Sequence, residues 1–227
     1  MSNASKKLTA REVKLLEKAT ADLQILRDGI ATRINFNGTT QKSVDLARVS
    51  KTLASDNFVT VLFNCLKQKL DYSKLIENLA VCEKGQDFIA NKVLVKIICL
   101  MQAIAGNAHN LDGYTKAVLF NLEKGNNDMT VFEIQQAVSR AVVNDNNAHR
   151  LCNSERHISN VKDSSIGTSA SQSSSSRMCL MYLNIASTVK GKKDAPLTIL
   201  KETNNGKAFT ALSEKLFSNH GMRAVAV

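Results

Sequence analysis

A single proline, Pro196, interrupts this chain of 227 residues. Proline lacks a backbone N–H and clashes with the preceding helical turn, so a chain nearly free of it can form long, unbroken helices. Aromatic residues make up only 5% of the sequence and tryptophan is absent, whereas β-rich folds usually contain more aromatic side chains. We therefore predict a mainly α-helical protein.

One long helix is predicted over residues 9–34. Thr9 stands three residues before Glu12, which is the spacing of a capping box at a helix start. One face then carries the apolar side chains Leu16, Leu23, Leu26, Ile30 and Ile34. Such a stripe indicates packing on a partner, either inside the domain or across a dimer interface.

Four more helices are predicted ahead of residue 108. Their ranges are 43–53, 56–70 with Asp56 as the cap, 72–83 ending at Gly85, and 86–105. The last is apolar nearly all round, so we expect it to be the central buried helix of the N-terminal half. Gly106 ends it, and a domain boundary there defines residues 1–108 as a helical domain for oligomerisation or partner binding.

A second domain is expected over residues 109–219, followed by a tail over 220–227. Its first two helices are predicted over 112–124 and 130–138. The second of them has a capping box formed by Thr130 and Glu133. After these helices, residues 144–165 lose the apolar periodicity and fill with Asn, Asp, Ser and His. We interpret that stretch as a long insertion with room for one short helix.

A serine-rich segment leads into an amphipathic helix over residues 171–185. Apolar side chains follow helical spacing at Met178, Met181, Tyr182 and Ile185. A helix enters a DNA major groove by its N-terminal end, where small side chains allow close approach and the helix dipole attracts phosphate. Gln can pair with adenine and Arg with guanine. We therefore predict DNA contacts from Ser171, Gln172, Ser173, Ser174 and Arg177. The alternative is a helix start rich in serine only because serine favours caps.

A basic hairpin follows this helix. Residues 186–190 and 196–201 can form two strands, and residues 191–195 make the turn between them. Lysines at the tip of such a hairpin can neutralise backbone phosphates and release counterions. We predict these phosphate contacts from Lys190, Lys192 and Lys193. A closing helix is expected to run to about residue 217.

The C-terminal half resembles the MarR-type winged helix-turn-helix proteins. In that family a helix of the form S-x-S-x-x-S-R-x-x-x-x-L precedes a β-wing, and the second strand leads into L-T-x-x-G-(R/K) and a closing helix. Residues 172–183 and 202–207 are similar to these patterns at a suitable separation, with Gln172 and Glu202 as the first residues of the two segments. The resemblance covers about residues 110–217 and implies a winged helix with a two-stranded β-wing that binds duplex DNA.

The chain departs from the family pattern in three places. The 144–165 insertion is much longer than the usual tight turn before the reading helix. The wing tip carries Lys192, Lys193 and Asp194 in place of the usual Asp-x-Arg. The N-terminal half does not resemble the family's dimerisation helix, so dimerisation and effector binding are not implied.

The net charge of +10 and the pI near 9.5 favour an anionic partner. Nucleic acid is the first candidate, and an acidic membrane surface or a merely solvated basic surface are the alternatives. The five cysteines are Cys65, Cys82, Cys99, Cys152 and Cys179. Their odd number, without CxxC spacing, predicts a reducing compartment and no disulfide framework. We expect a soluble, cytoplasmic protein.

No sequence pattern of an enzyme is present. The chain contains no Walker A loop, no GxGxxG and no HExxH. His149, Cys152 and His157 could be half of a metal site, but a second ligand pair is missing and we interpret them as polar loop residues. We expect neither catalysis nor a cofactor or metal.

The sequence therefore predicts a DNA-binding protein that acts as a transcriptional regulator and forms a homodimer through its N-terminal helices. The alternative is an assembly protein, for example one encoded by a phage or mobile element. Its winged helix and basic surface would then contact an acidic protein partner. A single-strand binder is disfavoured because three tyrosines and no tryptophan leave few stacking platforms.

The two groups of predicted contact residues should respond differently to substitution. Arg177→Ala should weaken duplex binding by about 1–3 kcal/mol and relax the base preference. Replacing Lys192 and Lys193 by Ala should weaken binding equally for all sequences and flatten its salt dependence. A gel-shift assay measures both effects, and loss of neither would rule out this assignment.

Overall fold

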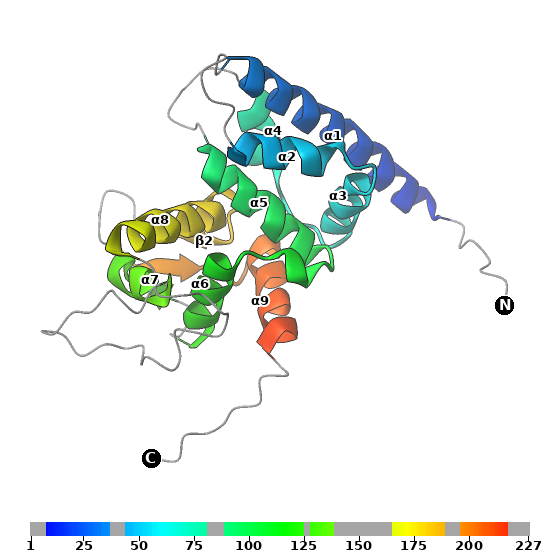
Figure 1. Ribbon diagram of the computed structural model, residues 1–227. Coiled ribbons are helices and arrows are strands. Elements are labelled where there is room, and N and C mark those ends of the chain that lie inside the picture. The colour runs from blue at the N-terminus through cyan, green and yellow to red at the C-terminus, as the bar shows by residue number, and fades with distance from the viewer. Residues whose placement is uncertain are drawn as a thin grey trace, which may run out of the picture. The chain divides into compact units, whose positions relative to one another are not determined.

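The computed structural model describes residues 8–36, 44–80, 89–124, 128–138, 165–188 and 196–217 (Figure 1). These residues are mainly helical and include a small three-stranded antiparallel sheet, which confirms the predicted fold class at that level. The chain divides into two compact units, Met1–Asn91 and Lys92–Val227.

The first unit is built around one long helix. Its helices are α1 (Ala10–Phe36), α2 (Val44–Ala54), α3 (Phe58–Lys67) and α4 (Ser73–Ala80). Helix α1 contacts the other three, and its predicted apolar stripe supplies the buried Leu23, Leu26 and Ile30. A Cβ at Gly29 would collide with the carbonyl of Leu79, so glycine permits the close approach of α1 and α4.

Both predicted capping boxes are present. Thr9 N–H donates to Glu12 Oε2 at 3.0 Å, and Glu12 N–H donates back to Thr9 Oγ1 at 3.3 Å. Thr130 and Glu133 make the same reciprocal pair at 2.7 and 3.2 Å. Each pair satisfies N–H groups that a helix start leaves without an intrahelical partner.

The predicted cap of the third helix is wrong. Helix α3 begins at Phe58, its N-cap position is Asn57, and no side chain caps it. Phe58 N–H bonds to the carbonyl of Ser55 at 3.0 Å, so residue 56 lies within a tight turn. Asp56 instead lies 3.7 Å from Arg27, which donates to the last carbonyls of α2.

The compact units divide earlier than the sequence placed the boundary. Helix α5 spans Asn91–Ile104, and Gly106, with a φ of +118°, stops it as predicted. It is buried nearly all round, also as predicted, but it lies with the second unit rather than with the N-terminal helices. Within that unit, Lys96 Nζ of α5 lies 2.6 Å from Asp112 Oδ1.

The second unit combines helices with a small sheet. After α5 come η1 (Ala108–Asn110), α6 (Gly113–Lys124), β1 (Asp128–Met129), α7 (Val131–Val138), α8 (Ile166–Tyr182), β2 (Ala186–Ser187), β3 (Leu197–Ile199) and α9 (Asn204–Phe217). The strand order is β1-β3-β2, and Thr198 of β3 pairs with Asp128 on one side and with Ser187 on the other. The predicted strands on either side of residues 191–195 therefore pair, over shorter lengths than expected.

Several predictions fall outside the described residues. They concern the 144–165 insertion, apart from its last residue, with His149, Cys152 and His157, the hairpin tip with Lys190, Lys192 and Lys193, and the tail over 220–227. Three cysteines within the described residues, Cys65, Cys99 and Cys179, are buried thiols.

The capping box of α1 makes a pH-dependent contribution to the stability of that helix. The hydrogen bond from Thr9 N–H, aided by Lys67, lowers the pKa of Glu12 from 4.5 to about 2. Because the folded-state pKa is depressed, the stabilisation is complete above pH 4.5 and is lost as the pH falls towards 2. NMR titration of the Glu12 carboxyl should give a midpoint near 2.

The same effect should appear in unfolding experiments. Glu12→Gln should destabilise the protein at pH 6 and have little effect near pH 2. Glu17→Gln is a suitable control, since Glu17 is exposed on the same helix and lies outside the cap. A midpoint near the ordinary glutamate value would show that the capping box does not form.

Candidate nucleic-acid interface

Helix α8 begins earlier than predicted. Ser165 is its N-cap, and the Ser165 hydroxyl accepts a hydrogen bond from Thr168 N–H at 3.3 Å. The helix therefore starts at Ile166, and the serine-rich tract is part of the helix instead of the turn that precedes it. This corrects the predicted start at residue 171 and changes which serines can reach a ligand.

Serines form part of the buried face of α8. Ser169, Ser173 and Ser176 repeat at helical spacing and are each at most 3% exposed. Ser169 Oγ donates to the carbonyl of Gln135 in α7 at 2.8 Å. Ser176 Oγ shares a hydrogen bond of 3.2 Å with Thr115 Oγ1 in α6. These small side chains bring α8 close to both helices, and hydrogen bonding offsets the cost of burying their hydroxyls.

The opposite face of α8 is open to solvent. It consists of Gly167, Ala170, Ser171, Ser174 and Met178, which we call the open face. Their spacing of three and four residues places them along one side of the helix. Four of the five are small, so a large partner could approach the helix backbone closely there.

Two of the predicted contact residues lie on the open face and two do not. Ser171 and Ser174 are exposed on it. Ser173 is only 3% exposed, and its hydroxyl donates to the carbonyl of Ala170 at 3.0 Å. Gln172 is half-buried and lies about 160° around the helix from Ser174, since each residue advances the helix by about 100°. Ser173 and Gln172 are therefore not part of the open face.

Arg177 lies at the edge of the open face. It is half-buried and about 60° around the helix from Ser174. Its Nε is buried and has no hydrogen-bond partner, and no carboxylate of the described residues pairs with its guanidinium. The surrounding sequence adds to this positive charge, because residues 164–193 contain four Lys or Arg and no Asp or Glu.

A buried polar network ties α8 to α5 and α6. Lys96 of α5 is 4% exposed, and its Nζ also lies 3.4 Å from Thr115 Oγ1. Asp112 Oδ1 accepts from both Lys96 Nζ and Thr115 N–H, the latter at 3.0 Å. Thr115 in turn bonds to Ser176 of α8. Burial next to this network raises the pKa of the Cys179 thiol, so that thiol stays protonated.

The C-terminal end of α8 is held by the segment that follows it. Asn184 has a φ of +50°, and Ile185 N–H bonds to the carbonyl of Leu180 at 2.9 Å, which ends the helix in a Schellman-type turn. Asn205 of α9 donates its side-chain amide to the carbonyl of Leu183. This hydrogen bond holds the first turn of α9 against the end of α8.

The motif shared with the MarR-type pattern at residues 202–207 has a structural explanation. Thr203 Oγ1 accepts a hydrogen bond from Gly206 N–H at 2.9 Å and so caps α9. A Cβ at Gly206 would collide with the carbonyl of Leu200. The threonine and glycine are thus explained by the turn into α9 without any ligand.

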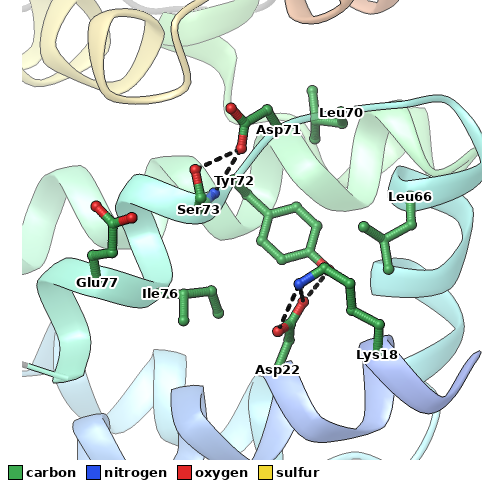
Figure 2. A pocket seen from close by; sticks show the side chains of 9 residues that line it. All are labelled: Lys18, Asp22, Leu66, Leu70, Asp71, Tyr72, Ser73, Ile76 and Glu77. Atoms are coloured by element: carbon green, nitrogen blue, oxygen red, sulfur yellow. Dashed lines mark hydrogen bonds and ion pairs between the residues drawn. The ribbon is translucent and has the colours of Figure 1, made fainter. Parts of the chain in front are cut away.

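The first unit contains a shallow pocket of about 150 Å³ beside α1, α3 and α4 (Figure 2). Its polar centre is Asp22, which accepts from Tyr72 Oη at 2.8 Å and lies 3.1 Å from Lys18 Nζ. Burial and this hydrogen bond raise the pKa of Tyr72. The carboxylate is satisfied by these two partners, so the arrangement joins α1 to the segment before α4 and needs no ligand.

Comparison of the chain with known protein families, curated proteins and solved structures found no match. Along the described helices, no stretch has both the length and the apolar character needed to cross a lipid bilayer. Within the same residues, no three His, Cys, Asp or Glu side chains gather as metal ligands.

Sequence reasoning missed Gly167, Ala170 and Met178 as members of the exposed face. The N-cap is the signal that could have found them, because Ser165 stands three residues before Thr168 at the end of the predicted insertion. Starting the helix there makes residues 167, 170, 171, 174 and 178 one continuous stripe.

Two glycines of the second unit should respond in opposite ways to alanine. Gly206→Ala should lower the free energy of unfolding by about 1–3 kcal/mol, because backbone atoms occupy the space of the new methyl group. Gly167→Ala should be neutral or stabilising by up to about 1 kcal/mol, because the space there is open and alanine favours helix. Denaturant unfolding measures both changes. Equal effects of the two substitutions on the free energy of unfolding would contradict the close packing of Gly206 against Leu200.

Proposed function

We propose that the second unit is a winged-helix module that binds duplex DNA with the open face of α8. The observation that carries this proposal is the combination of small exposed side chains on α8 with a stretch of 30 residues, 164–193, that lacks any acidic side chain. A surface of this kind lets the helix backbone approach closely and places no negative charge against phosphate.

The order of elements supports the proposal. Helices α6, α7 and α8 precede the pair β2 and β3, and α9 closes the unit. Helix α8 contacts both α6 and α7, as expected of a reading helix supported by two others. Residues 188–196 join β2 to β3, which is where the resemblance expects a wing, with Lys190, Lys192 and Lys193 as its phosphate contacts.

The dimensions and chemistry of α8 suit the DNA major groove. A helix with its side chains is about 10–12 Å across, and the groove is about 12 Å wide. Ser171 and Ser174 present hydroxyls that can bond to base edges or phosphates, and the guanidinium of Arg177 places a positive charge at the edge of the same face. In this proposal Ser173 and Gln172 support the helix and do not contact DNA.

The proposal is for a binding protein without a catalytic step, and regulation of transcription is the role that such binding suggests. The first unit then serves oligomerisation or partner binding through its outer surface, because the apolar stripe of α1 is already buried against α2, α3 and α4. An assembly protein with an acidic protein partner would use the same basic surface, so the DNA-binding experiment has to distinguish the two.

A negative charge placed on the open face should weaken binding to DNA. Ser174→Glu introduces one negative charge at the centre of this face, where it would face phosphate or base acceptors. Ala211→Glu is the matched control, because Ala211 is exposed on α9 and the change in net charge is the same. We expect Ser174→Glu to weaken binding to a labelled duplex at least tenfold and Ala211→Glu to have little effect.

Fluorescence anisotropy with a random-sequence duplex at 50 mM salt is the measurement. Absence of binding by the unmodified protein would overturn the DNA proposal and favour the acidic protein partner. Equal weakening by both variants would mean that only overall charge matters and that α8 does not form the interface.

A further inference from the structure

Lys92 lies beside the open face, although it belongs to α5 and not to the group formed by α6, α7, α8 and the sheet. Lys92 is in the first turn of α5, and its Nζ donates to Ser171 Oγ on α8 at 2.8 Å. The two residues are 79 positions apart in sequence, so the contact is made by folding of the second unit. Lys92 is half-buried, which leaves its ammonium at the border between α5 and the solvent-exposed side of α8.

The charge of Lys92 is not neutralised by a carboxylate of any described residue. Two other lysines of the second unit do have such a partner: Lys96 lies 2.6 Å from Asp112, and Lys207 lies 4.0 Å from Glu202. Among the described residues, the partner of Lys92 is the neutral hydroxyl of Ser171. An ammonium group has three N–H donors, so it can bond to this hydroxyl and to a phosphate at the same time.

The positions around α8 place a cation on each side of the open face. Ser171 lies three residues before Ser174, and Arg177 lies three residues after it. Three residues correspond to about 60° around a helix, in opposite directions for the two neighbours. Lys92 therefore stands at the Ser171 edge, and Arg177 stands at the other edge, with Ser174 between them.

This arrangement matches the charge pattern of a major groove, which is bordered by one phosphate backbone on each side. We infer that Lys92 binds a phosphate of one DNA strand while α8 occupies the groove, so that α5 is part of the DNA interface. This inference rests on the proposed function of α8. The bond to Ser171 holds the lysine side chain at the edge of the groove, which reduces the conformational entropy lost on binding.

The salt dependence of binding tests the inference directly. Each phosphate contact contributes about 0.9 to the slope of log K against log salt concentration. Lys92→Met keeps most of the side-chain volume and removes the charge, so the slope should fall by about 0.9 and the affinity at 0.1 M salt by about eightfold. Lys92→Arg should retain both the slope and the affinity, because it keeps the positive charge.

Lys215→Met is the matched control, because Lys215 is exposed on α9 and the change in net charge is identical. We expect it to leave the slope unchanged. Circular dichroism and the thermal midpoint of each variant show whether it is folded, and Lys92→Gln replaces Lys92→Met if the latter is destabilised. The binding measurements use the full chain and the random-sequence duplex described above.

The outcomes separate this inference from the proposed function. If the unmodified protein binds and Ser174→Glu weakens binding, but Lys92→Met leaves the slope unchanged, the role of Lys92 is overturned and α8 stands. Equal loss of slope with Lys92→Met and Lys215→Met would mean diffuse attraction and would also overturn it. No binding by the unmodified protein overturns both.

Discussion

The second unit depends on the buried ammonium group of Lys96. Its side chain is 5% exposed and that of Asp112 is 21% exposed, so the pair is largely removed from water. A buried charge that loses its partner costs about 3–5 kcal/mol, which makes the position of α5 against the start of α6 strongly determined. Thr115 extends the same network to Ser176, and the network thereby also sets the position of α8.

The features that the sequence predicted well are those with a local cause. Both capping boxes and the end of α5 at Gly106 depend on residues within four positions of one another, and all are present. The predicted start of α8 is wrong because the buried face of its first turns consists largely of serine. A search for apolar periodicity does not detect such a face. The sheet was only partly foreseen, since two residues of β1 are too few to show an alternating pattern.

The candidate surface could be predicted only in part for a related reason. Serine is common at caps, in tight helix contacts and in exposed positions, so residue type alone cannot separate Ser174 from Ser173. Their difference of one position turns the side chain by about 100°, from solvent to the interior. Lys92 is beyond local reasoning altogether, because its partner on α8 is 79 residues away.

Chemical modification of the buried thiols would report the opening of each unit. Cys65 belongs to the first unit, and Cys99 and Cys179 belong to the second. Burial raises the pKa of Cys65 to about 12, so the reactive thiolate is nearly absent while α3 stays packed. Oxidation or alkylation at these positions therefore requires that the surrounding helices separate first. The identity of the modified cysteine consequently shows which unit opened. In the folded protein, burial keeps oxidants away from all three of these thiols.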